Sequence, residues 1–113
     1  TLIGNSGNNF LRGAGGDDIL IGNAGEDVLF GGSGDDIFKL TEGTGYDQIR
    51  DFTKGEDKIN IQGFDDIGIV GNGNNSNIYN GDDLLAIVFN ALSSKNKLST
   101  LYTKTEKFLL IAS

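Results

Sequence analysis

The chain has 113 residues, with 16 acidic and 9 basic side chains, a formal net charge of −7, and neither cysteine nor histidine. This balance excludes a basic face for nucleic acid, and the missing residue types exclude disulfides, zinc ligation by His or Cys, and the commonest general base. Glycine, with 18 residues, exceeds twice its usual share of about 7%, and the apolar content of 37% is too low for a large conventional core.

Four rows of nine residues follow one another without insertion from residue 4 to residue 39: GNSGNNFLR, GAGGDDILI, GNAGEDVLF and GGSGDDIFK. Each row has Gly at positions one and four, Asn or Asp at position six, and Leu or Phe at position eight. Six turn-forming residues and three strand-forming residues predict a turn and a short strand per row. The chain therefore winds, and rows two apart, separated by 18 residues, are expected to stack in parallel.

The eighth position predicts the interior of this wound chain. Its apolar side chains are expected to face inward: Leu11, Leu20, Leu29 and Phe38. The apolar residues beside them are expected to face outward: Ile19, Ile21, Val28 and Phe30. Their apolar character indicates either a contact surface or only the β-propensity of short strands, and the second interpretation is favoured.

Stacking brings together the sixth-position side chains of alternate rows. Asp18 is expected beside Asp36, and Asn9 beside Asp27, because 18 residues separate the members of each pair. Carboxylates that converge with turn carbonyls form an all-oxygen cage, which suits a hard divalent cation. Ca²⁺ suits it best because it accepts six to eight oxygens in irregular geometry. The spacings predict about three to four Ca²⁺ ions.

The pattern resembles the RTX, or hemolysin-type, calcium-binding nonapeptide G-G-x-G-x-D-x-U-x, whose repeats form a parallel β-roll. The resemblance implies that ions bind between stacked turns, with side-chain ligands from position six and main-chain carbonyls from the turn. The implied side-chain ligands are Asp18, Asp27, Asp36 and the uncharged Asn9, whose site is expected to be weaker. The implied main-chain ligands lie in the same turns: Asn5, Gly7, Ala14, Gly16, Gly22, Asn23, Ala24, Gly25, Gly31, Gly32, Ser33 and Gly34.

Acidic side chains also occur at the fifth position of three rows, directly before the implied ligands. They are Asp17, Glu26 and Asp35. We interpret them as solvated turn residues; the alternative is that they supply negative charge outside the ligand shell.

Residues 40–62 keep one half of the motif with a longer period. Asp47 follows Asp27 by 20 residues, and Asp57 follows Asp36 by 21. Each is therefore expected to complete a calcium site with its partner, in turns widened by the inserted residues.

Asp51 lies in the segment GYDQIRDFTKGEDKINI, which resembles the stretch that commonly ends such rolls in secreted bacterial proteins. Two roles fit this residue, a calcium ligand and a hydrogen-bonded corner. Together, residues 1–62 are predicted to form an RTX parallel β-roll.

Residues 63–92 predict a capping β-meander, because a repeat stack needs an atypical end that covers its last strand edges. Short strands are expected at 65–70, 76–80 and 82–89. The Asn-Gly-Asp at 80–82 is a strong hairpin signal between the last two.

Residues 93–113 form a C-terminal tail with a different charge. The tail carries four lysines and one glutamate, whereas the rest of the chain is acidic. It is compatible with an uncleaved type I secretion signal. The alternative is a final strand or helix that packs on the cap, with 105–111 as a strand.

These observations predict an all-β protein, a calcium-loaded parallel β-roll with a C-terminal hairpin or meander cap. Without cation the aspartates repel and the glycine-rich turns cost entropy, so the chain is expected to fold only at extracellular calcium of roughly 10⁻⁴–10⁻³ M. We expect a folding and stabilising module of a larger secreted protein. Its expected partners are an upstream domain and the type I secretion machinery, and its expected location is extracellular, either free or at the cell surface.

The alternative function is a polysaccharide-binding or adhesin module, in which basic and aromatic side chains bind an anionic polysaccharide. The candidates are Phe10, Arg12, Phe30, Lys39, Tyr46, Arg50 and Lys58. An independent enzyme is not expected, because the repeat carboxylates already have a metal role and His and Cys are missing. A membrane span is not expected either, since the longest apolar run, 84–89, is far shorter than the required length of about 20 residues.

Overall fold

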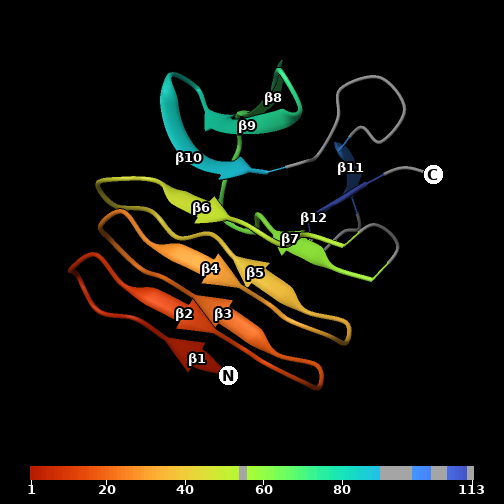
Figure 1. The fold of residues 1–113 in the computed structure, drawn as a ribbon. Coiled ribbons are helices and arrows are strands. Elements are labelled where there is room, and N and C mark those ends of the chain that lie inside the picture. The colour runs from red at the N-terminus through yellow and green to blue at the C-terminus, as the bar shows by residue number, and fades with distance from the viewer. Residues whose placement is uncertain (54–55, 90–97, 103–106, 112–113) are drawn as a thin grey trace.

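The computed structural model describes residues 1–53, 56–89, 98–102 and 107–111, and it consists of two six-stranded sheets. Short strands alternate with turns, so that successive strands belong to opposite sheets, as Figure 1 shows for the first half of the chain. The predicted parallel β-roll is therefore confirmed.

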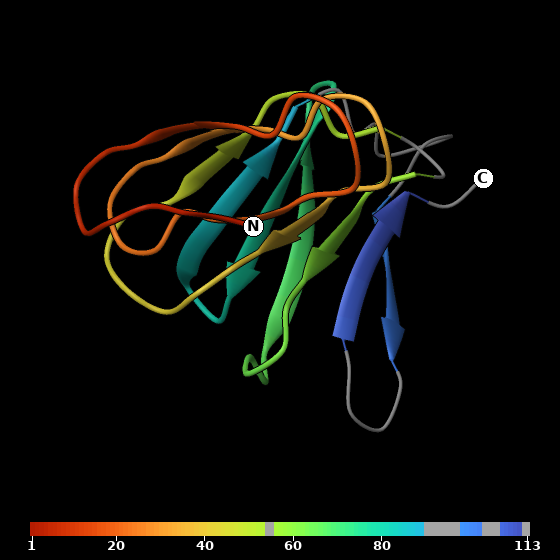
Figure 2. The same cartoon turned by 90° about the horizontal axis from the view of Figure 1, so that it is seen from below.

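Seven strands build the roll, and each follows a turn at the place where the repeat puts its apolar triplet. They are β1 (Leu2–Ile3), β2 (Phe10–Arg12), β3 (Ile19–Ile21), β4 (Val28–Phe30), β5 (Ile37–Lys39), β6 (Asp47–Ile49) and β7 (Lys58–Asn60). One sheet has the order β1-β3-β5-β7 in its roll part, and the other has β2-β4-β6. All of these neighbours are parallel, and seen from below their turns nest over one another (Figure 2).

The register of the strands follows the predicted repeat. Leu20 pairs with Phe38, 18 residues later. The widened rows are accommodated without loss of alignment, because Leu29 pairs with Ile49 and Phe38 pairs with Ile59. Equivalent positions therefore lie above one another through the whole roll.

The core lies between the two sheets, on the column of eighth-position side chains. Leu20, Leu29 and Phe38 are each 0% exposed, as predicted. Leu11 is only half-buried, because β2 has a strand neighbour on one side alone among the described strands. The flanking apolar residues face outward as expected, with Ile19 exposed.

The predicted meander is present as three antiparallel strands that extend the second sheet. They are β8 (Ile67–Asn72), β9 (Asn75–Asn80) and β10 (Asp83–Val88). The hairpin signal is confirmed, since β9 and β10 are joined at Gly81, whose φ of 61° is the left-handed value such turns need. Strand β10 runs parallel to β6 and covers its edge. The boundary between roll and cap at residue 62 stays a prediction.

A last hairpin consists of β11 (Leu98–Tyr102) and β12 (Lys107–Ile111). The strand expected near the C-terminus is present at 107–111, but it does not pair with the cap. It pairs antiparallel with β7 of the roll and so covers the edge of the first sheet, as β10 covers the second. The rest of the predicted tail, 93–97, 103–106 and 112–113, lies outside the described residues.

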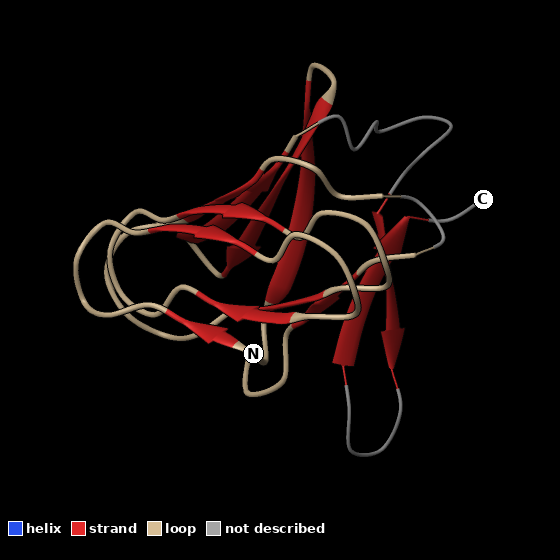
Figure 3. Cartoon of the chain, turned by 60° about the horizontal axis from the view of Figure 1, so that its bottom comes forward, coloured by secondary structure: helices blue, strands red, loops and turns tan. Residues whose placement is uncertain are grey.

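Strands and turns account for the described chain, as the colouring of Figure 3 shows. In these residues there is no helix long and apolar enough to cross a membrane.

Candidate metal sites

The turns form two stacks, one at each end of the strands (Figure 1). One stack contains the turns at 4–9, 22–27 and 40–46, and the other contains those at 13–18, 31–36 and 50–57. Left-handed backbone recurs at the second and fourth positions, for example at Gly32 (φ 85°) and Gly34 (φ 97°). Ala14 and Asn23 adopt it without being glycine, at φ 69° and 67°.

The sixth-position residues form a ladder along each stack. In each step a main-chain amide donates to the carboxylate Oδ1 of the residue one turn further along the stack. The distances are 2.7 Å from Asn9 N to Asp27, 2.9 Å from Asp18 N to Asp36, and 2.9 Å from Asp36 N to Asp57. Asp47 likewise accepts a hydrogen bond from the Asp27 main chain. The structure thus brings together the sixth-position pairs that the repeat predicted.

The second carboxylate oxygen of three aspartates is buried and has no hydrogen-bond donor within the described structure. These atoms are Oδ2 of Asp18, Asp27 and Asp36. Asp27 is 0% exposed and Asp36 is 1% exposed. Because a buried, unpartnered carboxylate oxygen is costly, each of these atoms is a candidate cation ligand.

The first glycine of the second, third and fourth rows is approached closely by such an oxygen. A Cβ built on Gly13 would lie 2.6 Å from Asp18 Oδ2 and 2.6 Å from the carbonyl oxygen of Gly31. A Cβ on Gly31 would lie 2.5 Å from Asp36 Oδ2, and one on Gly22 would collide with Asp27 Oδ2. Any side chain would displace these oxygens, so glycine allows Oδ2 and, at Gly13, a turn carbonyl to converge, and Ca²⁺ binds such convergent oxygens at 2.3–2.6 Å.

Asn9 and Asp57 differ from these three aspartates, because no oxygen of their side chains is left without a donor. A main-chain amide of the same turn donates to the single oxygen of Asn9 and to the second oxygen of Asp57. Asn5 N donates to Asn9 Oδ1 at 2.9 Å, and Thr53 N donates to Asp57 Oδ2 at 2.8 Å. Both residues lie in an outermost turn of the roll. Their roles as cation ligands stay predictions, and the unpartnered oxygens belong to Asp18, Asp27 and Asp36.

Burial and neighbouring negative charge oppose ionisation of the ladder. Burial, with smaller contributions from the charges of Asp57, Asp18 and Asp51, raises the pKa of Asp36 to about 6. Burial, followed by the charge of Asp27, raises the pKa of Asp47 to about 8. Burial also raises the pKa of Asp57. A divalent cation would remove this electrostatic cost.

The implied main-chain ligands occupy the same turns, and several are tightly packed. The carbonyl of Gly22 faces Gly4 beside the Asn9 side chain, with 2.7 Å to a Cβ built on Gly4. The carbonyls of Gly7, Ala14, Gly16 and Gly25 each lie against a glycine of the next turn in the stack. The roles of the implied main-chain ligands, Asn5, Asn23, Ala24, Gly32, Ser33 and Gly34 among them, stay predictions.

Two contributions to the stacks were missed from the sequence. Fifth-position side chains are exposed, as expected, but they also accept hydrogen bonds: Glu26 N donates to Asn8 Oδ1 at 2.9 Å, and Asp35 N donates to Asp17 Oδ1 at 2.8 Å. The Asn23 side chain donates to the Gly4 carbonyl at 2.8 Å. The 18-residue spacing that predicted the sixth-position ladder also holds for the fifth position.

The donor set is that of a hard cation. Carboxylate and carbonyl oxygens converge beside these glycines, and the sequence has no His or Cys. No group of three or more acidic side chains in the described ranges gathers as a metal cluster. The residues that fit Ca²⁺ are thus single aspartates with turn carbonyls, a mixture that calcium accepts.

Comparison with known proteins agrees with this geometry. The family model of the RTX calcium-binding nonapeptide repeat matches residues 3–38 with four copies. The fold is similar to the crystal structure of the C-terminal domain (RV) of MpAFP, with a TM-score of 0.51 and 18% identity over 100% of this chain and 99% of that chain. No curated protein matches the chain. Residues 3–38 therefore belong to the RTX calcium-binding nonapeptide repeat family.

Proposed function

We propose that the chain is a calcium-dependent folding module of a secreted protein. The observation that carries this proposal is the set of three buried carboxylate oxygens without a donor, on Asp18, Asp27 and Asp36. Each of these oxygens packs so closely against a glycine that any side chain there would collide with it. The family match over residues 3–38 supports calcium as the cation.

The three aspartates share one task in this proposal, and two of them have a second. In Asp27 and Asp36, Oδ1 accepts an amide from the preceding turn of the stack and so fixes the spacing of the turns. In Asp18, Asp27 and Asp36, the unpartnered Oδ2 holds the cation. Calcium, when bound, supplies the positive charge that the stacked carboxylates lack, and its binding free energy becomes folding free energy. Strands of three residues bury too little apolar surface to order the glycine-rich turns alone.

Coupling to extracellular calcium gives the module its role. Sites of this class bind at roughly 10⁻⁴–10⁻³ M, well above the calcium level inside cells. We propose that the chain stays unfolded during export through type I machinery, with the basic segment 93–113 as the exporter signal. It then folds outside the cell and stabilises an upstream domain of its parent protein.

A calcium titration followed by far-UV circular dichroism tests this proposal. The chelated chain is expected to lack the β-sheet spectrum and to regain it cooperatively as calcium is added, whereas magnesium at the same concentration has little effect. A β-sheet spectrum that persists after thorough chelation would contradict the proposal.

A second candidate function, binding of an anionic polysaccharide, is favoured by one surface of the roll. Both arginines of the sequence lie on the outer face of the second sheet, among aromatic rings. The Arg12 guanidinium is 5.4 Å from the ring centroid of Phe10 and 5.6 Å from that of Phe30, and Arg50 is 4.0 Å from that of Phe89. We call these five residues the arginine–phenylalanine face.

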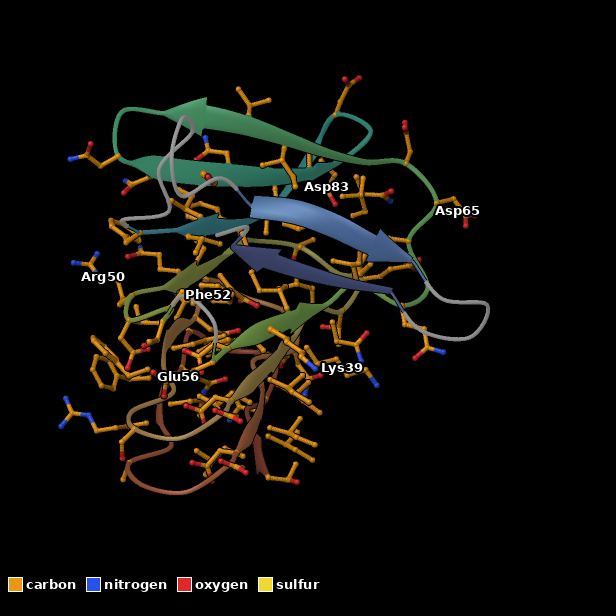
Figure 4. All side chains as sticks on the ribbon, turned by 90° about the vertical axis from the view of Figure 1, so that its right-hand side faces the viewer. Lys39, Arg50, Phe52, Glu56, Asp65 and Asp83 are labelled. Atoms are coloured by element: carbon orange, nitrogen blue, oxygen red, sulfur yellow. The ribbon has the colours of Figure 1, made fainter. Side chains whose placement is uncertain are left out.

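Stacking on rings holds the guanidinium planes in place, and their remaining N–H donors can bind carboxylate or sulfate groups. Arg50 already donates from Nη1 to Gln48 Oε1 at 3.1 Å. Exposed rings offer a flat apolar surface beside them, and Phe10 is 59% exposed. Lys39 and Lys58, the other basic candidates, belong to the opposite sheet, and Figure 4 shows Lys39 and Arg50 on different sides of the molecule.

Calorimetric titration of calcium-loaded protein with dextran sulfate tests the second candidate, with neutral dextran as the control ligand. Arg12→Gln is expected to weaken binding, whereas Lys39→Gln removes the same charge from the opposite sheet and should not. Heat that is equal for both variants, or that is absent for dextran sulfate, would remove this candidate.

A further inference from the structure

Asp51 accepts hydrogen bonds from two main-chain amides with its two carboxylate oxygens. Both amides belong to the turn at 31–36, which is the fourth turn of the roll in chain order, as 13–18 is the second. Gly31 N donates to Oδ1 and Gly32 N donates to Oδ2, each at 2.8 Å. The Thr53 hydroxyl donates to the Asp51 carbonyl at 3.3 Å and ties its backbone to the same corner. Of the two roles that fitted Asp51 from the sequence, the structure therefore shows the hydrogen-bonded corner.

The widened last turn explains why a side chain is needed here. In the regular turns the first-position amide meets a main-chain carbonyl, from Gly4 N to Ile21 O and from Gly13 N to Phe30 O, each at 2.8 Å. The fourth turn is followed in its stack by a turn with inserted residues. The equivalent amide, that of Gly31, meets the Asp51 carboxylate instead.

The Gly31–Gly32 peptide links Asp51 to the Asp18 carboxylate, because its carbonyl oxygen and Asp18 Oδ2 converge beside Gly13. In a planar trans peptide the N–H and the C=O point in opposite directions. Asp51 holds the N–H of this peptide, so the Gly31 carbonyl points to the other side. There its oxygen and Asp18 Oδ2 each lie 2.6 Å from the position of a Cβ on Gly13. A hydrogen bond to an anion also polarises the peptide and makes its carbonyl a stronger acceptor.

We infer that Asp51 is a positioning residue for the cation site between the second and fourth turns. It aims and polarises the Gly31 carbonyl and does not bind the cation itself. This inference rests on the proposed calcium role of the roll, and it adds a residue that the nine-residue motif does not contain.

Asp51→Asn is the variant that tests the inference, because an amide keeps one acceptor and turns a donor toward the other glycine amide. Phe52→Leu is the matched structural control. Phe52 adjoins Asp51, is buried, and packs against Phe38 with ring centroids 6.2 Å apart, but it makes no hydrogen bond to the Gly31–Gly32 peptide. Asp51→Glu is a second variant that keeps both acceptors.

The full chain loaded with ¹¹³Cd²⁺, a calcium substitute of similar radius, gives an NMR resonance for each occupied site. In Asp51→Asn one resonance is expected to move and its site to bind about 10- to 100-fold more weakly, the usual loss when a group that orients a metal ligand is removed. Phe52→Leu is expected to leave all resonance positions unchanged. Asp51→Glu is expected to move the same single resonance and to recover part of the affinity.

Unmoved resonances in both Asp51 variants, with only a lower folding stability, would show that Asp51 is a structural corner and would overturn the inference. A wild-type chain without any cadmium resonance would contradict the calcium role itself, so the two failures are distinguishable.

Discussion

Replacement of Gly13 by alanine should close one cation site while leaving the repeat otherwise intact. The added Cβ would lie 2.6 Å from both Asp18 Oδ2 and the Gly31 carbonyl oxygen, so side chain and backbone must move apart. Gly13 does not have left-handed backbone, so the substitution adds no strain of that kind. The expected loss comes from steric displacement and from the missing ion.

The magnitude follows from these two terms. Overpacking of a tight site costs about 1–3 kcal/mol. Loss of one ion that binds with a dissociation constant of roughly 10⁻⁴–10⁻³ M removes about 1.4–2.7 kcal/mol of folding free energy at about 10 mM calcium. The free energy of unfolding should therefore fall by about 2–6 kcal/mol in all.

Gly15→Ala is the matched control in the same turn. Its Cβ would meet only the Ser33 hydroxyl, at 3.6 Å, an ordinary contact. Its stability should change by about 1 kcal/mol at most. The assay is urea unfolding followed by circular dichroism at about 10 mM calcium, with a calcium titration of each variant. Equal stability and equal calcium midpoints for the two variants would refute the assignment of the Asp18 and Gly31 oxygens beside Gly13 to a cation site.

Three further predictions concern single residues and pH. Asp36→Asn should strongly raise the calcium concentration at the midpoint of a circular-dichroism titration, whereas Asp35→Asn should shift it little. Of these two neighbouring residues, Asp36 is the one with an unpartnered buried oxygen. Equal shifts for the two variants would contradict this prediction. Ala14→Gly should raise the free energy of unfolding in urea by about 0.5–1 kcal/mol, since glycine removes the left-handed strain but adds unfolded-state entropy. A variant that is less stable than the wild-type chain would contradict this prediction. Raised carboxyl pKa values stabilise the folded state below the unfolded pKa of 3.8, and this stability is lost as pH rises through about 6 for Asp36 and about 8 for Asp47. The chelated chain should therefore gain β-sheet signal when titrated from pH 8 to pH 5, while calcium affinity falls; no gain would contradict the sign.

The repeat predicted those parts of the fold that depend on a fixed spacing. Eighth-position side chains such as Leu20 and Phe38 are buried, and Asp18 lies beside Asp36, because both features follow from rows that stack two apart. The period also predicted that Asp57 stays aligned with Asp36 despite inserted residues. A regular solenoid repeats its contacts, so one correct spacing predicts many of them.

Features that depend on contacts outside the period could not be predicted in the same way. A final strand on the cap was the alternative interpretation of the tail, but β12 pairs with the free edge of β7, and no local sequence pattern determines which sheet edge it joins. The closure of Asn9 by Asn5 N and of Asp57 by Thr53 N depends on the shape of each outermost turn. Nothing in the spacing distinguishes these residues from aspartates with a free oxygen.

The most direct test is a crystal structure of the chain grown in calcium, with anomalous diffraction used to locate the ions. We expect anomalous peaks within bonding distance of Oδ2 of Asp18, Asp27 and Asp36, which are the three buried oxygens without a donor. Asp27 and Asp36 are expected to keep Oδ1 on the main-chain amides of Asn9 and Asp18. If these Oδ2 atoms were bonded instead to water or protein donors, with no anomalous peak beside them, calcium would not be part of this fold.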